Sequence, residues 1–446
     1  MPEYLAPGVY VEETLFRAKS IEGVSTMTTG FIGPTRYGPL DIEPDIVTSM
    51  VEFERTYGDR ERLEYSGVGE IDNYMWHAVR AFFEEGGKRL YISRVFKPGN
   101  DTEALSGFAL GPLASGSSPA FSVRARFPGK FGNARVTFTL KVGQNVLARE
   151  GGVTKLRSVS DRDVVWVRDV VSPFSPPVNT GGYFLVLWDA ANRTWKFNSS
   201  GDDLSAATIE LQADVDPAQG HEVRIVTVTV TADPISAEAQ PFVTADFPLD
   251  PKHQRAGSPD SVFAYFDIHP ASLARARTVP IVIYGMAPGR TGVDILQAFF
   301  DVYEIMSPPF SPPDMGLQAN LENSSSNTEQ RSVMVSLENG NDGIRPTMSE
   351  YEGQGSGAED LPKTGLKQFE DLEDISIVAA PGSTYGFNNG YESQARAITG
   401  LLIRHTERMR YRIAILDCGN DQSISEVRAF RAQSKYAALY YPVSCS

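Results

Sequence analysis

The sequence predicts a mixed fold (α+β or α/β), in which a discontinuous α/β core domain carries a β-rich inserted domain. Two observations predict this class. Amphipathic stretches with helical spacing alternate with apolar strand-like runs near both ends, whereas the middle contains short β-type runs between Gly, Pro, Ser and Asp clusters. We expect an N-terminal arm, a first core part, a β-rich insertion and a second core part, at residues 1–20, 21–95, 96–335 and 336–446.

The first core part has the pattern of a strand, a helix and a second strand. Residues 24–33 are rich in β-formers and end at a Gly-Pro turn. A helix is expected at residues 72–85, where apolar side chains recur at i, i+3, i+4, i+7 and i+8 and so lie on one face. Two glycines end this helix, and residues 89–95 then have the composition of a strand.

The middle region is expected to form a sandwich or a barrel-like β structure. Its predicted strands lie at residues 134–142, 164–167, 183–188, 223–230 and 279–284. Two Pro-rich near-repeats, at residues 172–177 and 307–313, are expected to be exposed loops, because Pro is excluded from central strands. Residues 320–330 are expected to be a polar loop.

The second core part returns to the α/β pattern. A strand at residues 374–381, a helix at 391–408 and a strand at 412–417 predict a right-handed crossover between two parallel strands. A final helix is expected at residues 423–438.

Composition excludes several classes of protein. Forty-one Lys and Arg against 56 Asp and Glu give a net charge of −15, which argues against broad direct binding to nucleic acid. The two cysteines, Cys418 and Cys445, are too few for a disulfide framework and indicate a protein made in the cytoplasm. The chain has no apolar run of about 18 residues and no signal-peptide layout, so we expect no direct membrane contact and export by lysis or within a particle.

The sequence gives no coherent active site. Its five histidines have no metal-ligand spacing, and Cys418 has no nearby basic partner in the sequence. The loop at residues 381–390 contains no Lys and lacks the glycine spacing of a phosphate-binding loop. We therefore expect a protein that is not an enzyme, with no catalytic residue, no cofactor and no metal.

Several segments occur in an order and with a spread that together are quite specific. They include an opening Pro-Gly-Val-Tyr arm, a Phe-Pro-Gly-Lys-Phe-Gly-Asn turn and a Leu-Glu-Asn-Gly-Asn-Asp-Gly segment. These segments lie at residues 6–13, 21–34, 47–58, 78–95, 127–133, 337–343, 374–382 and 434–442. Together they resemble the contractile tail sheath family of phage tails and phage-tail-like injection particles.

The resemblance implies a structural function. Sheath subunits stack as hexameric rings around an inner tube and contract, without nucleotide, to drive the tube through a target envelope. The implied partners are other copies of the chain, the inner tube protein, and baseplate and terminal cap proteins. Assembly is expected in the bacterial cytoplasm, before the subunit forms part of a phage tail or contractile particle. The sequence does not distinguish a phage from a bacteriocin, a secretion machine or an extracellular injection system, and it gives neither host nor cargo.

Terminal arms of the family add strands to the sheets of neighbouring subunits. The residues with the right composition for such an inter-subunit arm are Pro7, Gly8, Val9, Tyr10, Val11 and Glu12. A frayed terminus is the alternative.

Two basic groups are prominent in this acidic chain. One comprises Arg404, Arg408, Arg410 and Arg412, and the other comprises Arg428, Arg431 and Lys435 on the expected final helix. The second group is the candidate surface for an acidic inner tube, with an ordinary solvated face as the alternative.

A departure from the family lies at the C-terminal end. In the family, a segment like residues 435–442 is followed by further chain that completes the core domain, so we expect the core domain here to lack its usual C-terminal segment. A truncated chain, a missing part supplied elsewhere and a specialised variant are all open. The alternative function is a baseplate, cap or adaptor protein with a sheath-like fold that forms a terminal ring.

Overall fold

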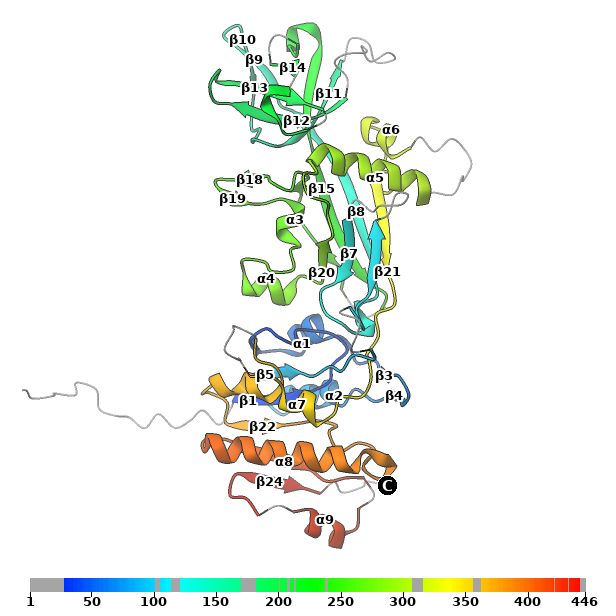
Figure 1. Ribbon diagram of the computed structural model, residues 1–446, viewed down its shortest axis with the longest axis vertical. Coiled ribbons are helices and arrows are strands. Elements are labelled where there is room, and N and C mark those ends of the chain that lie inside the picture. The colour runs from blue at the N-terminus through cyan, green and yellow to red at the C-terminus, as the bar shows by residue number, and fades with distance from the viewer. Residues whose placement is uncertain are drawn as a thin grey trace, which may run out of the picture.

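The computed structural model of the chain combines helices with mixed sheets in an elongated molecule, which confirms the general α+β class (Figure 1). A six-stranded sheet lies at one end, and a nine-stranded sheet extends from the middle toward the other end. The described residues are 28–100, 105–113, 121–169, 182–199, 201–206, 209–211, 214–236, 240–306, 316–355, 362–420, 422–431 and 433–441. The expected arm and both Pro-rich repeats lie outside them.

The six-stranded core sheet takes its strands from both ends of the chain. Its order is β2-β5-β1-β22-β23-β24, and all neighbours are parallel except β2 and β5. The strands are β1 (Thr28–Gly33), β2 (Ile46–Val47), β5 (Arg89–Arg94), β22 (Ile377–Ala379), β23 (Ile413–Asp417) and β24 (Ala437–Tyr440). Strand β1 pairs with both β5 and β22, so the N-terminal and C-terminal segments share one sheet.

Helices cover the two faces of this sheet unequally. The core helices are α1 (Met50–Tyr57), α2 (Tyr74–Glu84), α7 (Met348–Glu352), α8 (Glu392–Met409) and α9 (Ile424–Phe430). Helix α2 begins where the Asn73 side chain accepts the backbone N–H of Trp76, a normal N-cap. One apolar cluster joins α1 and α2 to β1 and β5, and another joins α7 and α8 to β22 and β23.

The nine-stranded sheet is antiparallel throughout its described pairs. Its order is β14-β13-β12-β11-β15-β8-β21, and β16 and β17 also pair with β15. Its strands are β8 (Ala134–Asn145), β11 (Val164–Asp169), β12 (Gly182–Asp189), β13 (Thr194–Asn198), β14 (Ile209–Glu210), β15 (His221–Pro234), β16 (Phe242–Val243), β17 (Phe247–Pro248) and β21 (Ser332–Leu337).

Smaller elements surround the two main sheets. Short antiparallel sheets are formed by β3 (Leu63–Tyr65) with β4 (Gly69–Ile71), β9 (Leu147–Glu150) with β10 (Val153–Leu156), β18 (Gln254–Arg255) with β19 (Ser258–Pro259), and β7 (Phe121–Ala125) between β6 (Leu110–Leu113) and β20 (Ile281–Tyr284). The remaining helices are α3 (Val262–Tyr265), α4 (Leu273–Thr278), α5 (Gly292–Met306) and α6 (Leu317–Glu322).

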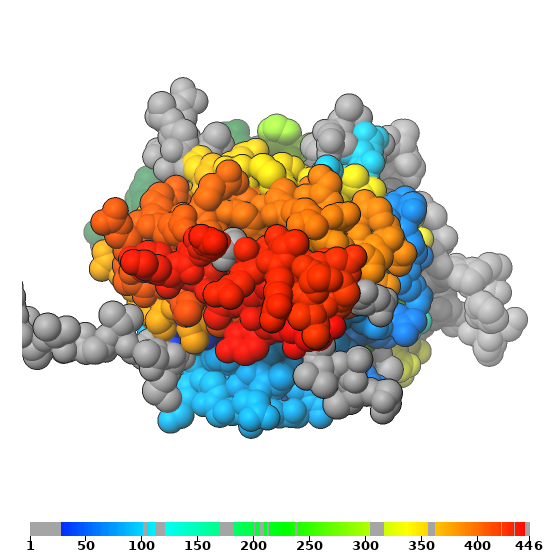
Figure 2. All heavy atoms as spheres, turned by 90° about the horizontal axis from the view of Figure 1, so that it is seen from below, coloured from blue at the N-terminus to red at the C-terminus, as the bar shows by residue number. Residues whose placement is uncertain are grey.

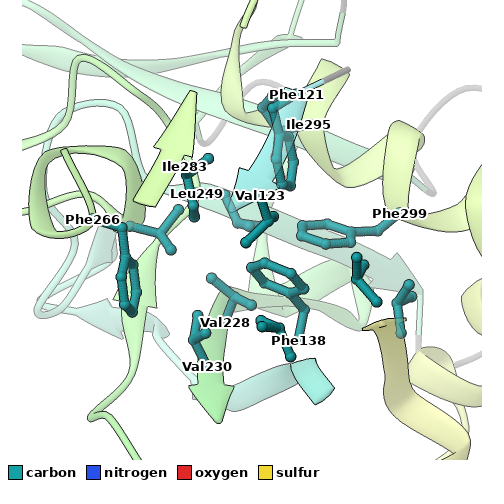
Figure 3. Packing of buried hydrophobic residues seen from close by; sticks show 14 of the residues in the cluster. Phe121, Val123, Phe138, Val228, Val230, Leu249, Phe266, Ile283, Ile295 and Phe299 are labelled. Carbon is teal, nitrogen blue, oxygen red and sulfur yellow. The ribbon is translucent and has the colours of Figure 1, made fainter. Parts of the chain in front are cut away.

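The largest hydrophobic cluster of the described residues joins the nine-stranded sheet to α5 and to β7 and β20 of the three-stranded sheet. Phe138 of β8 is fully buried, with its ring centroid 5.9 Å from that of Phe121 and 5.3 Å from that of Phe299 (Figure 3). Such edge-to-face and tilted contacts add stability beyond the area that the rings bury. This cluster gives the β-rich part a core of its own.

The predicted strand–helix–strand unit is confirmed: β22 and β23 are parallel, and α8 connects them. Two other expectations are wrong. The expected loop at residues 320–330 is limited to residues 323–328, because α6 includes Asn320 and a 3₁₀ helix follows at Glu329–Arg331. The final helix ends at Phe430, after which residues 437–440 form β24. Parallel pairing with β23 half-buries Ala437 and Leu439 against the apolar cluster under α8, so tertiary packing outweighs the helix propensity of this Ala-rich segment. Helix α5 was not predicted, although Ile295, Phe299 and Val302 have helical spacing.

Candidate functional site

The described residues offer few groups that could act in catalysis or bind a metal ion. They include no group of three or more His, Cys, Asp or Glu side chains placed to hold a metal ion. Burial raises the pKa of the Cys418 thiol, which lowers its reactivity as a nucleophile. In the part of the chain that the structure describes, no helix combines the length and the apolar character needed to cross a membrane.

Two of the motifs singled out in the sequence meet where the core sheet joins the β-rich part. One is the turn at residues 127–133, and the other is the segment at residues 337–343. The Asn133 amide donates to the carbonyl oxygen of Gly340 at 3.0 Å, and its oxygen accepts the N–H of Gly340 at 2.9 Å. Since the two segments are about 200 residues apart, this reciprocal pair is a long-range connection. We call the contact region between these two motifs and the core sheet the junction.

Asp342 connects three segments at the junction. Its carboxylate is buried and accepts the backbone N–H of Lys130 and that of Glu64, both at 2.9 Å. Burial raises the pKa of this carboxyl, although the two backbone hydrogen bonds oppose the shift. One side chain thus holds the hairpin β3–β4 and both motifs together.

Arg94, at the end of β5, is the second connector. Its guanidinium is 1% exposed and donates to the carbonyl oxygens of Thr35 at 3.2 Å, Gly38 at 2.8 Å and Pro128 at 2.8 Å. Burial lowers the pKa of Arg94 to about 10, so the side chain stays charged at neutral pH. Three carbonyl groups from the core and from the motif turn are therefore satisfied by one buried cation.

The glycines of the two motifs are required by close backbone approach. Gly129 has a φ of +132°, and a Cβ added there would lie 2.0 Å from the carbonyl oxygen of Arg36. Gly343 has a φ of +72°, and its Cβ would lie 2.1 Å from the carbonyl oxygen of Lys97. No other residue fits either position without moving the backbone.

An ion-pair cluster ties the β-rich part to the core beside these motifs. The buried Arg36 contacts the carboxylate of Asp59 and also lies 2.8 Å from Glu61. Asp59 in turn accepts a hydrogen bond from Ser236, which follows β15. Sequence reasoning missed Arg36, Asp59 and Arg94, because nothing local distinguishes a buried charge from an exposed one.

A polar hollow of about 860 Å³ opens beside the junction. Glu64, Lys130 and Asp342 contribute to its lining, together with several glycines. Lys130 donates to Glu64 at 2.6 Å across its rim, and this ion pair is about half exposed. The described residues that line the hollow include no His or Cys and no pair of a nucleophile with a general base.

The core sheet ends in an edge strand. In the described structure β24 pairs with β23 on one side and with no strand on the other. Tyr440 and Tyr441 at this edge are 60% and 48% exposed. An unpaired strand edge offers backbone groups to a strand from another chain.

The two basic groups predicted from the sequence have different environments. Arg428 lies on α9, Arg431 follows it, and Lys435 lies in the turn before β24; all three are exposed and have no ion pair within the described part. They are close in sequence, but the expectation that all three lie on one final helix is wrong, because α9 ends at Phe430.

The other group does not form a basic face. Arg412 is 2% exposed and donates to His405 at 2.8 Å and to the carbonyl oxygen of Ile375 at 3.1 Å. Arg408 pairs with Glu370. Only Arg404 and Arg410 remain at the surface without an ion pair among the described residues.

The six predicted arm residues lie outside the described part of the chain, so their geometry adds nothing to the site. In comparisons with known proteins, no family model matches the chain and no curated protein matches it.

Proposed function

We propose that this chain is the sheath subunit of a contractile tail or injection particle, which stacks in hexameric rings around an inner tube and contracts to drive it through an envelope. In this proposal the six-stranded sheet is the core domain, formed by residues 21–95 and 336–446, and residues 96–335 are an insertion. The proposed partners are further copies of the chain, the tube protein, and baseplate and cap proteins.

The observation that carries the proposal is the junction. The resemblance to sheath proteins rests on short motifs that are far apart in the sequence, and two of these motifs are in direct contact. Their glycines and Asp342 are in positions where the backbone geometry depends on them. Motifs that resemble a family by chance have no reason to meet in one structural element, so the contact supports the resemblance.

The junction also fits the mechanics of a contracting lattice. Contraction by rigid-body rotation of subunits requires that each subunit transmits force without bending. Buried groups that join the two sheets, such as Arg94 and Asp342, stiffen the connection. The β-rich part then moves with the core domain as one unit.

Contacts between subunits are assigned to the terminal arm and to the sheet edge. Pro7, Gly8, Val9, Tyr10, Val11 and Glu12 form the proposed arm. An arm of this kind adds a strand to an open edge such as that of β24. Arg428, Arg431 and Lys435 are the candidate contacts with an acidic inner tube.

The experiment that tests the proposal is negative-stain electron microscopy of the purified full-length chain, alone and with its tube protein. Long tubes with a cogwheel cross-section are the expected result. Isolated rings would favour the baseplate, cap or adaptor alternative, and monomers alone would contradict both. Charge reversal at Arg428 and Arg431 tests the tube contact separately, because unchanged attachment to the tube would remove that assignment and leave the sheath proposal intact.

A further inference from the structure

The core sheet has one half-face that no described helix covers. On one side of the sheet, Val378, Ala414 and Leu416 pack under α8. On the opposite side, Phe31 and Ile92 of β1 and β5 pack under α1 and α2. That opposite side continues across β22, β23 and β24, where no described helix lies over the strands.

The topology explains this gap. From β1 the chain crosses to β5 in one direction along the sheet, whereas β22, β23 and β24 follow one another in the other direction. Right-handed crossovers therefore place α1 and α2 on one face and α8 and α9 on the other. Viewed from below, orange α8 and the red C-terminal segment lie together, and the light-blue residues near α2 lie on the side of the red segment that faces away from α8 (Figure 2).

The uncovered half-face is apolar. Alternation along β23 and β24 turns Ile413, Ile415, Ala438 and Tyr440 toward it, and Ile377 of β22 joins them. Ile413 and Tyr440 are 37% and 60% exposed, and the other three are partly buried. We call Ile377, Ile413, Ile415, Ala438 and Tyr440 the open patch.

Parallel strands are normally buried on both faces, because helices pack on each side of the sheet. Three neighbouring strands are about 10 Å wide between the outer two. A single α-helix with its side chains is about 10 Å in diameter. The open patch therefore has the width that one helix covers.

The charge beside the open patch favours a basic partner over an acidic one. Asp417 follows the open patch on the same side of β23, is exposed, and forms no ion pair within the described part of the chain. A covering helix that carried an acidic residue there would be repelled. A Lys or Arg at the same place would pair with Asp417 at the border of an apolar contact.

We propose that the open patch is the docking site of one amphipathic α-helix with basic polar residues, supplied by another polypeptide. Its apolar stripe packs on the three isoleucines, and a basic residue pairs with Asp417. This contact uses the side chains of a sheet face and is separate from strand addition at the β24 edge. It holds whether or not the chain is a sheath subunit, so the two proposals stand or fall independently.

A labelled 14-residue helical peptide of Leu and Lys, with its leucines on one face, is the probe for the test. Fluorescence anisotropy with the full-length chain is expected to show binding that weakens about tenfold in the double variant I413S/I415S. The matched control is Val243→Ser, at a 63% exposed apolar residue of β16, which is expected to bind like the unmodified chain. The same peptide with Glu in place of Lys is expected to bind more weakly.

A second variant keeps the proposal testable if I413S/I415S does not fold. Asp417→Asn changes an exposed side chain and is expected to narrow the difference between the Lys and Glu peptides. Circular dichroism and the thermal midpoint of each variant are checked first.

Three results would overturn the proposal. One is equal binding by I413S/I415S and Val243→Ser, and another is absence of binding to the unmodified chain, as expected if residues 1–27 already cover the patch. The third is concentration-dependent self-association in size-exclusion chromatography with light scattering that I413S/I415S abolishes, which would identify a second copy as the occupant.

Discussion

The junction and the distal hairpins of the β-rich part are built in different ways. At the junction, backbone segments about 200 residues apart are held by buried polar groups and by glycines that permit close approach. In the hairpin β9–β10, neighbouring strands pair across a two-glycine turn, and a Cβ added to Gly151 would meet nothing within 4 Å. Local pairing tolerates change, whereas the junction depends on contacts that must all form together.

The two regions also differ in how they satisfy buried polar groups. Arg94 donates hydrogen bonds to three carbonyl oxygens, and Asp342 accepts hydrogen bonds from two backbone N–H groups. Neither side chain has a described partner of opposite charge at hydrogen-bonding distance. Removing such a group leaves several buried atoms unsatisfied at once. The distal hairpin uses ion pairs at the surface, where water replaces a lost partner.

The largest effect is expected at Gly129. Gly129→Ala should lower the free energy of unfolding by more than about 4 kcal/mol, because the new Cβ would collide with the Arg36 carbonyl oxygen. Gly151→Ala, also at positive φ but in open space, should cost about 1 kcal/mol. Urea unfolding followed by fluorescence measures both. Equal losses would show that the junction is no more constrained than the hairpin.

Arg94→Ala is expected to have the next largest effect, about 3 kcal/mol in the free energy of unfolding. The three carbonyl oxygens that it serves would be left buried without a donor. Arg80→Ala is the control, since Arg80 lies on α2 with about half of its side chain exposed, forms an ion pair with Glu84 and lies over the ring of Trp76. A loss at Arg94 no larger than that at Arg80 would remove Arg94 as a connector.

Two buried histidines should give opposite pH dependences. His405 accepts a hydrogen bond from Arg412, and burial together with this cation lowers its pKa to about 3. As pH falls from about 6.5, His405 becomes protonated in the unfolded chain but stays neutral in the folded chain. The free energy of unfolding therefore falls by up to about 1.4 kcal/mol per pH unit. His405→Gln should flatten this acid slope in unfolding measurements between pH 4 and 6.5. An unchanged slope would contradict it.

His253 in the β-rich part is the counterpart. Burial lowers its pKa, but ion pairs with Asp163, whose carboxylate lies 3.1 Å from Nε2, and with Asp260, whose carboxylate lies 2.5 Å from Nδ1, outweigh this, and the pKa is raised overall. Its contribution to stability is complete below its ordinary pKa and is lost as pH rises through the raised value. His253→Gln should therefore remove a decline in stability on the alkaline side, and it should leave the acid slope due to His405 in place.

The smallest effects are expected at exposed ion pairs. Glu64→Gln at the junction and Glu150→Gln in the hairpin should both leave the urea midpoint almost unchanged, because water screens these pairs. A clear loss for Glu64→Gln alone would mean that the rim of the junction contributes as much as its buried groups.

Much of the fold was predictable from residue patterns. The helical spacing at residues 72–85 gave α2, and the run at residues 374–417 gave the parallel pair β22 and β23 with α8 between them. The residues with β-type composition in the middle gave β8, β11, β12, β15 and β20. These elements follow from local periodicity, which needs no knowledge of the partner that each apolar face packs against.

The rest was decided by tertiary contacts. Residues 437–440 have helical composition, yet they form β24 because the edge of β23 is available to them. Arg412 has the sequence context of an exposed basic residue, yet it is buried against His405. The open patch could not be predicted from the sequence either, because it exists only where the order of the strands leaves a half-face without a helix. Sequence periodicity specifies which residues of a helix or strand face a hydrophobic core. Only the spatial order of distant strands decides which elements those residues pack against, and whether a helix covers each face of the sheet.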